Sequence, residues 1–155
     1  KNILIYLYKA IEYHNIASVG YYVGGMKEAD LKESETKTII IATYAMAAEG
    51  LDIKTLSTLI FATPRTDITQ AVGRILRIKH KQPVIIDIID NHDIFKRQWY
   101  KRKKFYEKNK YKIINTNNNL YELDDWKVLY DSNIPKSKLQ NNESNSIIGK
   151  CLIKI

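Results

Sequence analysis

The sequence has little of what stabilises secreted, membrane or metal-binding proteins. Its 155 residues include one cysteine, so no internal disulfide can form and a reducing, intracellular compartment is expected. No run of about 18 apolar residues occurs, so we expect no membrane-spanning helix. The three histidines are scattered away from cysteines and carboxylates, which predicts no metal site in this chain. Because the chain opens on Lys1 without a signal-peptide pattern or an initiator methionine, we expect a segment of a longer protein.

Signatures of nucleotide sites are also missing. No G-x-x-x-x-G-K-[ST] loop is present, and residues 147–151, IIGKC, lack its first glycine and the hydroxyl after Lys150. No D-E-x-H or D-E-x-D box is available to hold Mg²⁺. No G-x-G-x-x-G follows the first predicted strand, which disfavours a small-molecule enzyme of the Rossmann type. This chain alone therefore cannot assemble a complete ATP site.

Positive charge is present in excess and is concentrated in one element. The formal net charge is +8, from 25 Lys and Arg against 17 Asp and Glu. Residues 96–112 hold nine of the basic residues and one Glu, so they carry the whole excess while the rest of the chain is balanced. Such a local concentration predicts a polyanionic partner. A solvated helix face explains it equally well, and the charge alone does not decide between the two.

Hydrophobic patterning predicts strands and helices in alternation. Continuous β-branched runs such as KTIIIAT are typical of strands buried on both faces of a sheet. The predicted strands are residues 18–23, 37–43, 56–63 and 82–90. The predicted helices are residues 4–14, 44–50, 67–77 and 93–111, with Asp67 as the N-cap of the third, and residues 26–35 predict a polar helix or a turn. This order predicts an α/β fold in which helices cover both faces of a parallel sheet.

After residue 112 the character of the sequence changes. Residues 115–119, NTNNN, form a turn cluster between two strand-like segments and predict a hairpin. The Asn-, Ser- and Lys-rich stretch 131–146 predicts poor order. We therefore divide the chain into a first domain, residues 1–112, and a short C-terminal extension, residues 113–155, of hairpin and disordered character.

Three segments at the ends of predicted strands form a known pattern. In this order and spacing, YYVGGMKEADLKESE, IATYAMAAEGLDI and LIFATPRTDITQAVGRILR resemble the C-terminal, RecA-like lobe of superfamily 2 helicases. QAVGRILR and ATYAMAAEGLD are most similar to the XPB/UvsW-type helicases, including those of large DNA viruses. Swi2/Snf2 remodelling ATPases share much of this lobe but differ after the second arginine. The resemblance implies a RecA-like parallel sheet and, for a viral protein, a location in the host cytoplasm or the virion.

The resemblance implies a catalytic role for the arginines of QAVGRILR. In this family both arginines reach the triphosphate of ATP bound to the other lobe, and the i, i+3 spacing of Arg74 and Arg77 puts both on one helix face. Gln70 is expected near the nucleotide or its attacking water. Gly73 is expected to let an opposing backbone approach, at a cost of about 1 kcal/mol in helix propensity. Without the flanking motifs, a surface salt-bridge pair would be the simpler interpretation of the arginines.

The other two segments imply contacts with ATP and with a nucleic-acid backbone. Gly50 and Asp52 match motif V positions that approach the ATP ribose and the catalytic water. Thr43 matches a residue that hydrogen-bonds a nucleic-acid phosphate. Gly24 and Gly25 resemble the glycine-rich segment that lies along the sugar-phosphate backbone. Each has a structural alternative, since Gly50 can be a helix C-cap, Asp52 a turn residue and the glycine pair a tight turn.

Aromatic and basic residues lie on different sides of the predicted helix 93–111. One stripe is mainly aromatic and is most simply explained by packing in the core. The opposite side is basic and is the better candidate for sequence-independent binding to nucleic-acid phosphates. The residues of this basic side are Arg97, Lys101, Lys104 and Lys108.

The leading hypothesis is therefore the C-terminal lobe of an ATP-dependent DNA or RNA helicase or translocase. The resemblance implies that the rest of the ATP site, including the Mg²⁺ ligands, lies on an N-terminal lobe of the same polypeptide. The alternative is a stand-alone nucleic-acid-binding domain without ATPase activity, which uses the basic helix alone.

The missing signatures lead to the first testable prediction. We expect the purified 155-residue chain to hydrolyse no ATP, because it has neither the phosphate-binding loop nor the acidic box for Mg²⁺. Phosphate release from ATP measures this directly. Turnover that the purified chain sustains, and that Arg74→Ala abolishes, would contradict it.

Overall fold

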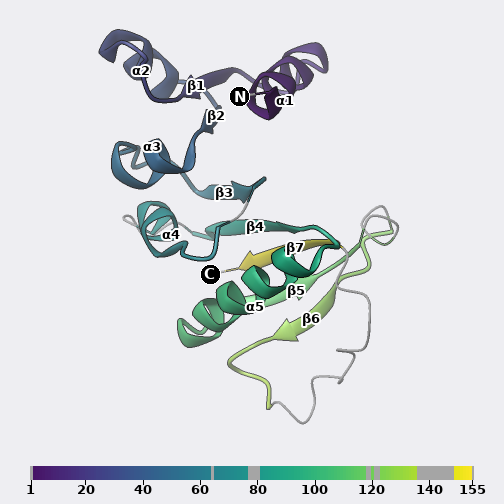
Figure 1. The fold of residues 1–155 in the computed structure, drawn as a ribbon. Coiled ribbons are helices and arrows are strands. Elements are labelled where there is room, and N and C mark those ends of the chain that lie inside the picture. The colour runs from purple at the N-terminus through teal and green to yellow at the C-terminus, as the bar shows by residue number, and fades with distance from the viewer. Residues whose placement is uncertain are drawn as a thin grey trace. The chain divides into compact units, whose positions relative to one another are not determined.

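Helices and short strands alternate along the chain (Figure 1). The computed structural model describes residues 2–63, 65–76, 81–117, 120, 123–135 and 149–154. The chain divides into two compact units, Lys1–Lys54 and Thr55–Ile155, and each is described by itself. Within the part of the chain that is described, no helix is long and apolar enough to cross a membrane.

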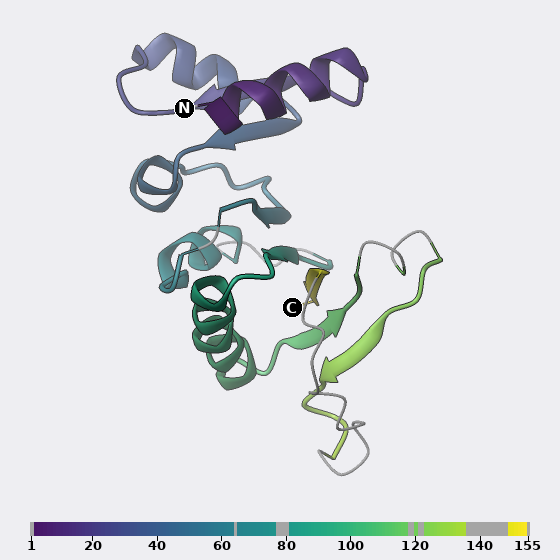
Figure 2. The ribbon, with the colours of Figure 1, turned by 45° about the vertical axis from the view of Figure 1, so that its right-hand side comes forward.

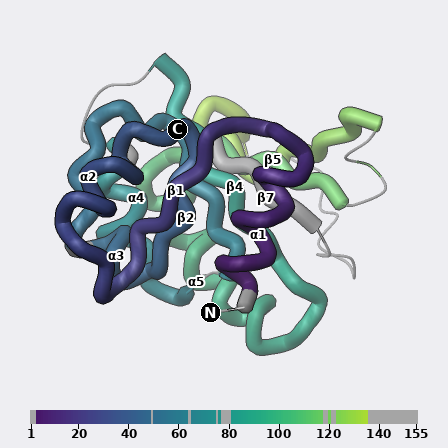
Figure 3. Tube along the Cα trace, turned by 90° about the horizontal axis from the view of Figure 1, so that it is seen from above, coloured from purple at the N-terminus to yellow at the C-terminus, as the bar shows by residue number. Residues whose placement is uncertain are grey.

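The first unit combines two parallel strands with flanking helices. Its elements are α1 (Asn2–Tyr13), β1 (Val19–Tyr22), α2 (Glu28–Glu35), β2 (Ile39–Ala42) and α3 (Tyr44–Glu49). β1 pairs with β2 so that Val19 lies opposite Ile39 and Tyr22 lies opposite Ala42. Figure 3 shows the two strands side by side, with α1 running next to them. Because the strands are parallel, the segments that follow them begin at the same edge of this small sheet.

The second unit is built on a mixed sheet. Its elements are β3 (Thr58–Phe61), α4 (Thr69–Ile75), β4 (Val84–Ile89), α5 (Asp93–Lys108), β5 (Lys112–Asn115), β6 (Lys127–Tyr130) and β7 (Gly149–Lys154). The five strands follow the order β3-β4-β7-β5-β6. β3 and β4 are parallel, whereas β7 runs antiparallel to both β4 and β5, and β6 runs antiparallel to β5. Figures 1 and 2 show α5 lying along one face of this sheet.

The core of the second unit lies between α5 and the sheet. Ile85 on β4 and Ile113 on β5 are fully buried, and so are Trp99 and Tyr106 on α5. Burying a large apolar side chain contributes roughly 1.5–3 kcal/mol relative to leaving it in water. The mainly aromatic stripe predicted on this helix is thus a packing surface, which confirms the core interpretation.

A charged pair is buried inside this core. Asp87 on β4 and Arg102 on α5 are both 0% exposed. The Arg102 Nε donates to Asp87 Oδ2 at 2.7 Å, and its Nη2 donates to Asp87 Oδ1 at 2.9 Å. The Tyr106 hydroxyl donates to the same carboxylate at 3.2 Å, and Arg102 Nη1 donates to the backbone oxygen of Arg65 at 3.0 Å. Burial raises the pKa of the Asp87 carboxyl, and the hydrogen bonds from Arg102 and Tyr106 counteract that rise.

The predicted order of helices and strands is confirmed, with corrections at their ends. The predicted helix 67–77 begins at Thr69, with Ile68 rather than Asp67 at the N-cap. The helix ends at Ile75 with Leu76 as its C-cap, and Arg77 lies outside the described residues. The helix predicted to reach residue 111 ends at Lys108, with Asn109 as its C-cap.

The prediction that the strands are buried on both faces is wrong for the second unit. Ile60 on β3 is 57% exposed, and burial alternates along β4, where Ile85, Asp87 and Ile89 are buried and their neighbours are half-buried. Helix α5 covers one face of β4, and a β-branched run does not by itself require a second cover. The fold is mixed α/β with short parallel pairs, β1 with β2 and β3 with β4.

The C-terminal segment adds a strand that the sequence patterning did not reveal. The predicted hairpin is confirmed by the antiparallel pairing of β5 with β6. β7 then pairs with β4 on one side and β5 on the other, so part of the predicted extension belongs to the central sheet. Of the stretch 131–146, residues 136–146 lie outside the described residues. The division between residues 1–112 and 113–155 stays a prediction.

The buried ion pair makes a prediction about stability. Arg102→Ala leaves the Asp87 carboxylate buried in the core without its cation. This change should lower the free energy of unfolding by about 3–5 kcal/mol. Tyr106→Phe leaves the ion pair in place, so it should cost only about 1 kcal/mol, the usual value of one hydrogen bond. Urea unfolding of both variants tests this difference. If both variants lose the same free energy of unfolding, the ion pair contributes no more to stability than the single hydrogen bond from Tyr106.

Candidate functional site

The ends of β1 and β2 bring two of the predicted nucleic-acid segments together. Tyr22 and Ala42 are register partners at the ends of the two strands, and the backbone N–H of Thr43 donates to the oxygen of Tyr22 at 3.3 Å. The loop with Gly24 and Gly25 begins one residue after Tyr22. Both segments therefore start at the same edge of the small sheet in the first unit.

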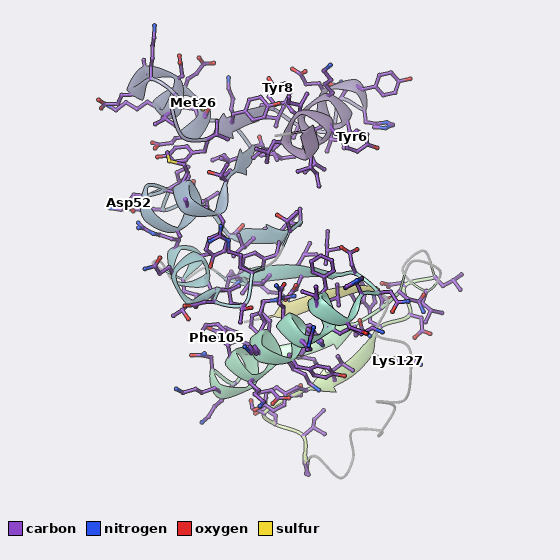
Figure 4. All side chains as sticks on the ribbon, viewed as in Figure 1. Tyr6, Tyr8, Met26, Asp52, Phe105 and Lys127 are labelled. Carbon is purple, nitrogen blue, oxygen red and sulfur yellow. The ribbon has the colours of Figure 1, made fainter. Side chains whose placement is uncertain are left out.

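The glycine loop is open on its outer side. Gly24 and Gly25 are exposed, and no described atom lies within 4 Å of a Cβ built on either of them. Gly25 has φ +86°, which favours glycine and confirms the tight-turn interpretation at this position. The turn is closed on its inner side, where the Val23 N–H donates to the sulfur of Met26 at 3.5 Å (Figure 4). Contact of this loop with a phosphate stays a prediction.

Thr43 stands immediately before helix α3. Its backbone is extended, with φ −74° and ψ 152°, and its side chain makes no capping hydrogen bond to the helix. Its backbone oxygen accepts from the Ala47 N–H at 2.9 Å, so the residue is fixed through its main chain. Thr43 is half-buried, and its hydroxyl does not cap the N-terminus of α3.

Helix α3 ends at Glu49 with Gly50 as its C-cap, and Tyr22 hydrogen-bonds to this C-cap residue. The Gly50 N–H donates to Met46 O at 2.9 Å, and the Tyr22 hydroxyl donates to Gly50 O at 3.1 Å while lying 3.3 Å from a Glu35 carboxylate oxygen. The C-cap position predicted for Gly50 is confirmed, although its φ of −100° is right-handed and requires no glycine. Asp52 follows on the exposed side of the unit (Figure 4). Neither residue's role toward ATP is tested by this geometry.

In the second unit, α4 separates a buried side from an exposed side. Ala71 and Val72 are 4% and 1% exposed and anchor the helix to the core. Gln70 and Gly73 are exposed and Arg74 is half-exposed, at i, i+3 and i+4 along the same helix face. No described atom lies within 4 Å of a Cβ built on Gly73, so nothing in the described part of this chain requires a glycine there.

The start of α4 is held at several points. The Thr69 N–H donates to Asp67 Oδ1 at 3.0 Å, and this bond lowers the pKa of the Asp67 carboxyl. Asp67 therefore stabilises the first turn from one residue before the observed N-cap, Ile68. Ile68 is 1% exposed and its oxygen accepts from the Val72 N–H at 2.9 Å. Two residues before Asp67, the oxygen of Arg65 accepts from the buried Arg102.

The basic side of α5 is exposed, as predicted. Its four residues, which we call the basic face, are Arg97, Lys101, Lys104 and Lys108. Three other basic residues of segment 96–112 have acidic partners, since Arg102 pairs with Asp87 in the core, Lys103 lies 4.0 Å from Glu107 and Lys112 lies 3.3 Å from Asp131. Among the described residues the structure records no ion pair for the basic face. Fewer basic residues are therefore available to bind a polyanion than the nine that segment 96–112 contains.

The described residues give no test of the predicted cofactors, ATP and Mg²⁺. Within the described ranges, no three His, Cys, Asp or Glu side chains gather as they would around a metal ion. The expectation that the Mg²⁺ ligands lie on another lobe stays a prediction, and so does the binding of ATP.

The sequence reasoning missed the residues that hold the start of α4 from a distance. Helical spacing puts Arg102 on the mainly aromatic side of the predicted helix 93–111, and Asp87 lies inside the predicted strand 82–90, but nothing in the sequence pairs the two. The available signal was a single acid inside the apolar run VIIDII, because a buried carboxylate needs a cation or several donors. That signal predicts a partner, but it does not say which of the many basic residues provides it.

Comparison with known proteins places the chain among viral sequences. It is 50% identical over 99 residues to "Putative ATP-dependent RNA helicase L396" of Acanthamoeba polyphaga mimivirus. It is 30% identical over 102 residues to "Putative ATP-dependent RNA helicase QP509L" of African swine fever virus. These matches cover 62% and 63% of the chain but only 19% and 20% of the two relatives. The chain thus spans about a fifth of their length.

A third relative is matched over most of its own length. The chain is 39% identical over 80 residues to "Uncharacterized protein 108L" of Invertebrate iridescent virus 3, which is 51% of the chain and 77% of that protein. The chain belongs to the same family as this protein. It is also homologous to a segment of the viral proteins named as helicases. No family model matches the chain, and no solved structure matches it at a significant level.

The open space around Gly73 makes a prediction. Gly73→Ala should raise the free energy of unfolding by about 1 kcal/mol, because alanine favours the helix and meets no described atom. Gly25→Ala is the matched control and should be destabilising by about 1–2 kcal/mol, because φ is positive there. Thermal or urea unfolding measures both. A destabilising Gly73→Ala would mean that the chain itself fills the space beside α4.

Proposed function

We propose that the chain is the C-terminal, RecA-like lobe of an ATP-dependent nucleic-acid helicase or translocase of superfamily 2, of the XPB/UvsW type. It contributes motif V, with Gly50 and Asp52, and motif VI, with Gln70, Arg74 and Arg77. The phosphate-binding loop and the Mg²⁺ ligands are contributed by an N-terminal lobe of the same polypeptide.

The observation that carries this proposal is the exposed face of α4. An arginine fork matches the oxygens of a phosphate and stabilises the charge that develops on a transferring phosphoryl group. Arg74 projects from a short helix whose other side is anchored by Ala71 and Val72, so its backbone has a defined position. Gly73 leaves room beside it, and the helix loses about 1 kcal/mol of propensity without any packing benefit from the described chain. A contact with a second lobe explains both features.

The first unit supports a nucleic-acid path. The segments with the exposed Gly24 and Gly25 and with Thr43 begin at the same edge of the small sheet, and the Thr43 hydroxyl makes no capping hydrogen bond to α3. Main-chain N–H groups and a hydroxyl are donors that bind phosphates without reading the bases. The basic face of α5 adds a second phosphate contact of the same kind. The names of the mimivirus and African swine fever virus relatives agree with a nucleic-acid-dependent ATPase.

One observation favours the second candidate, a stand-alone nucleic-acid-binding domain without ATPase activity. The 80 residues matched in the iridescent virus relative already make up 77% of that protein, which leaves little of it for a second lobe. Such a domain would use the basic face of α5 and would have no need of Arg74.

ATP hydrolysis by a protein that carries both lobes separates the two candidates. Arg74→Ala should lower kcat by about 10³-fold or more, because the transition-state charge loses its cation. Lys127→Ala, at an exposed position of strand β6 in the same unit (Figure 4), is the control and should leave kcat unchanged. If Arg74→Ala and Lys127→Ala hydrolyse ATP equally well, the motor assignment of this lobe is wrong.

A salt titration of single-stranded DNA or RNA binding tests the basic face. Replacing Lys101, Lys104 and Lys108 by Gln should weaken binding and lower the slope of log K against log salt by roughly 2, since each phosphate contact on a single strand contributes about 0.7. The matched control replaces three exposed lysines away from the proposed contacts, which are Lys9, Lys32 and Lys127. Both variants lose the same charge, so equal slopes in the two would show that α5 makes no phosphate contact.

A further inference from the structure

The guanidinium of Arg102 performs two tasks at once. Its Nε and Nη2 hold both oxygens of Asp87 on β4, at 2.7 and 2.9 Å. Its remaining Nη1 donates at 3.0 Å to the backbone oxygen of Arg65, which lies 37 residues earlier in the chain. The side chain is 0% exposed, so these hydrogen bonds form without competition from water. One residue therefore joins strand β4, helix α5 and the loop that leads into α4.

We propose that Arg102 is a positioning residue for the arginine-bearing helix α4. Through Asp87 it is fixed to the sheet, and through the Arg65 oxygen it fixes the loop that sets where α4 begins. For the role of Arg74 toward ATP, this inference rests on the function proposed above. The link between Arg102 and α4 itself is a property of the fold and is testable in the chain alone.

The path from Arg65 to Arg74 is short enough to transmit the constraint. Three residues separate Arg65 from Thr69, the first residue of α4. Within them, Asp67 accepts from the Thr69 N–H and Ile68 is buried, so the segment has little freedom once Arg65 is held. A shift of the Arg65 backbone would move the first turn of α4, and Arg74 lies near the end of the same seven-residue helix.

Arginine suits this position for a geometric reason. A guanidinium offers donors in a rigid planar fork, so one side chain can hold a carboxylate with two nitrogens and a backbone oxygen with the third. A lysine in the same place would keep the charge beside Asp87, but its single nitrogen cannot reproduce the three separate bonds. Arg102→Lys therefore retains the ion pair and removes the link to Arg65. Tyr106→Phe is the matched variant, because it removes one bond to Asp87 and leaves that link intact.

Amide hydrogen exchange in the 155-residue chain tests the link. Arg102→Lys should speed exchange of the Thr69–Ile75 amides by about tenfold relative to those of β1 in the first unit, the factor expected for loss of one net hydrogen bond. Tyr106→Phe should leave that ratio within about twofold. If Arg102→Lys does not fold, Asp87→Leu/Arg102→Met removes both charges and the link together, and the same acceleration is expected. Unchanged exchange in α4 overturns the proposal.

Kinetics of a protein with both lobes test the positioning role. Arg102→Lys should lower kcat about tenfold or more with the KM for ATP within about twofold, because misplacement of Arg74 affects the transition state more than substrate binding. Tyr106→Phe should leave both constants unchanged. Faster exchange in α4 without a loss of kcat overturns the positioning role. If Arg74→Ala also leaves kcat unchanged, the proposed function has failed, whereas the exchange result still decides whether Arg102 holds α4.

Discussion

The buried ion pair between Asp87 and Arg102 is the interaction on which the second unit depends. Removing two charges from water is costly, and the attraction between them offsets that cost only when the remaining donors and acceptors are also satisfied. Here the Tyr106 hydroxyl donates a further hydrogen bond to the Asp87 carboxylate, and the backbone oxygen of Arg65 accepts a further hydrogen bond from the Arg102 guanidinium. Because each of these partners belongs to a different part of the unit, satisfying the pair also sets the positions of β4, α5 and the loop before α4.

In each unit, the exposed residues proposed to bind ligands lie on segments that the unit's own packing holds in place. Ala71 and Val72 anchor α4 from inside, so Arg74 projects from a helix that has little freedom to move. In the first unit, the pairing of β1 with β2 aligns Thr43 with the glycine loop at one edge. In the function proposed above, both units present donors to phosphates from segments that follow parallel strands, where ligands bind in α/β sheets. A lobe that completes an ATP site held elsewhere needs this combination of a fixed backbone and an uncovered surface.

The elements that depend on local patterning could be predicted from the sequence. Helical spacing in α5 separated Trp99 from Lys101 and Lys104, and the structure places them on buried and exposed sides. Strand pairings and ion-pair partners far apart in the sequence could not be predicted, because they depend on which segments meet in space. β7 follows a polar stretch and gives no signal that it pairs with β4. Similarly, helical spacing puts Arg102 on the mainly aromatic side of α5, but nothing in the sequence shows that Asp87 is its partner. The roles of the site residues toward ATP and nucleic acid came from the resemblance, and they remain proposals.

The central claim is that the exposed face of α4 addresses the triphosphate of ATP bound to another lobe. A solved structure of both lobes with a non-hydrolysable ATP analogue and Mg²⁺ tests it most directly. The account predicts the Arg74 guanidinium within about 3 Å of a phosphate oxygen, at hydrogen-bond distance. A closed, nucleotide-filled complex in which Arg74 faces away from the phosphates would contradict it.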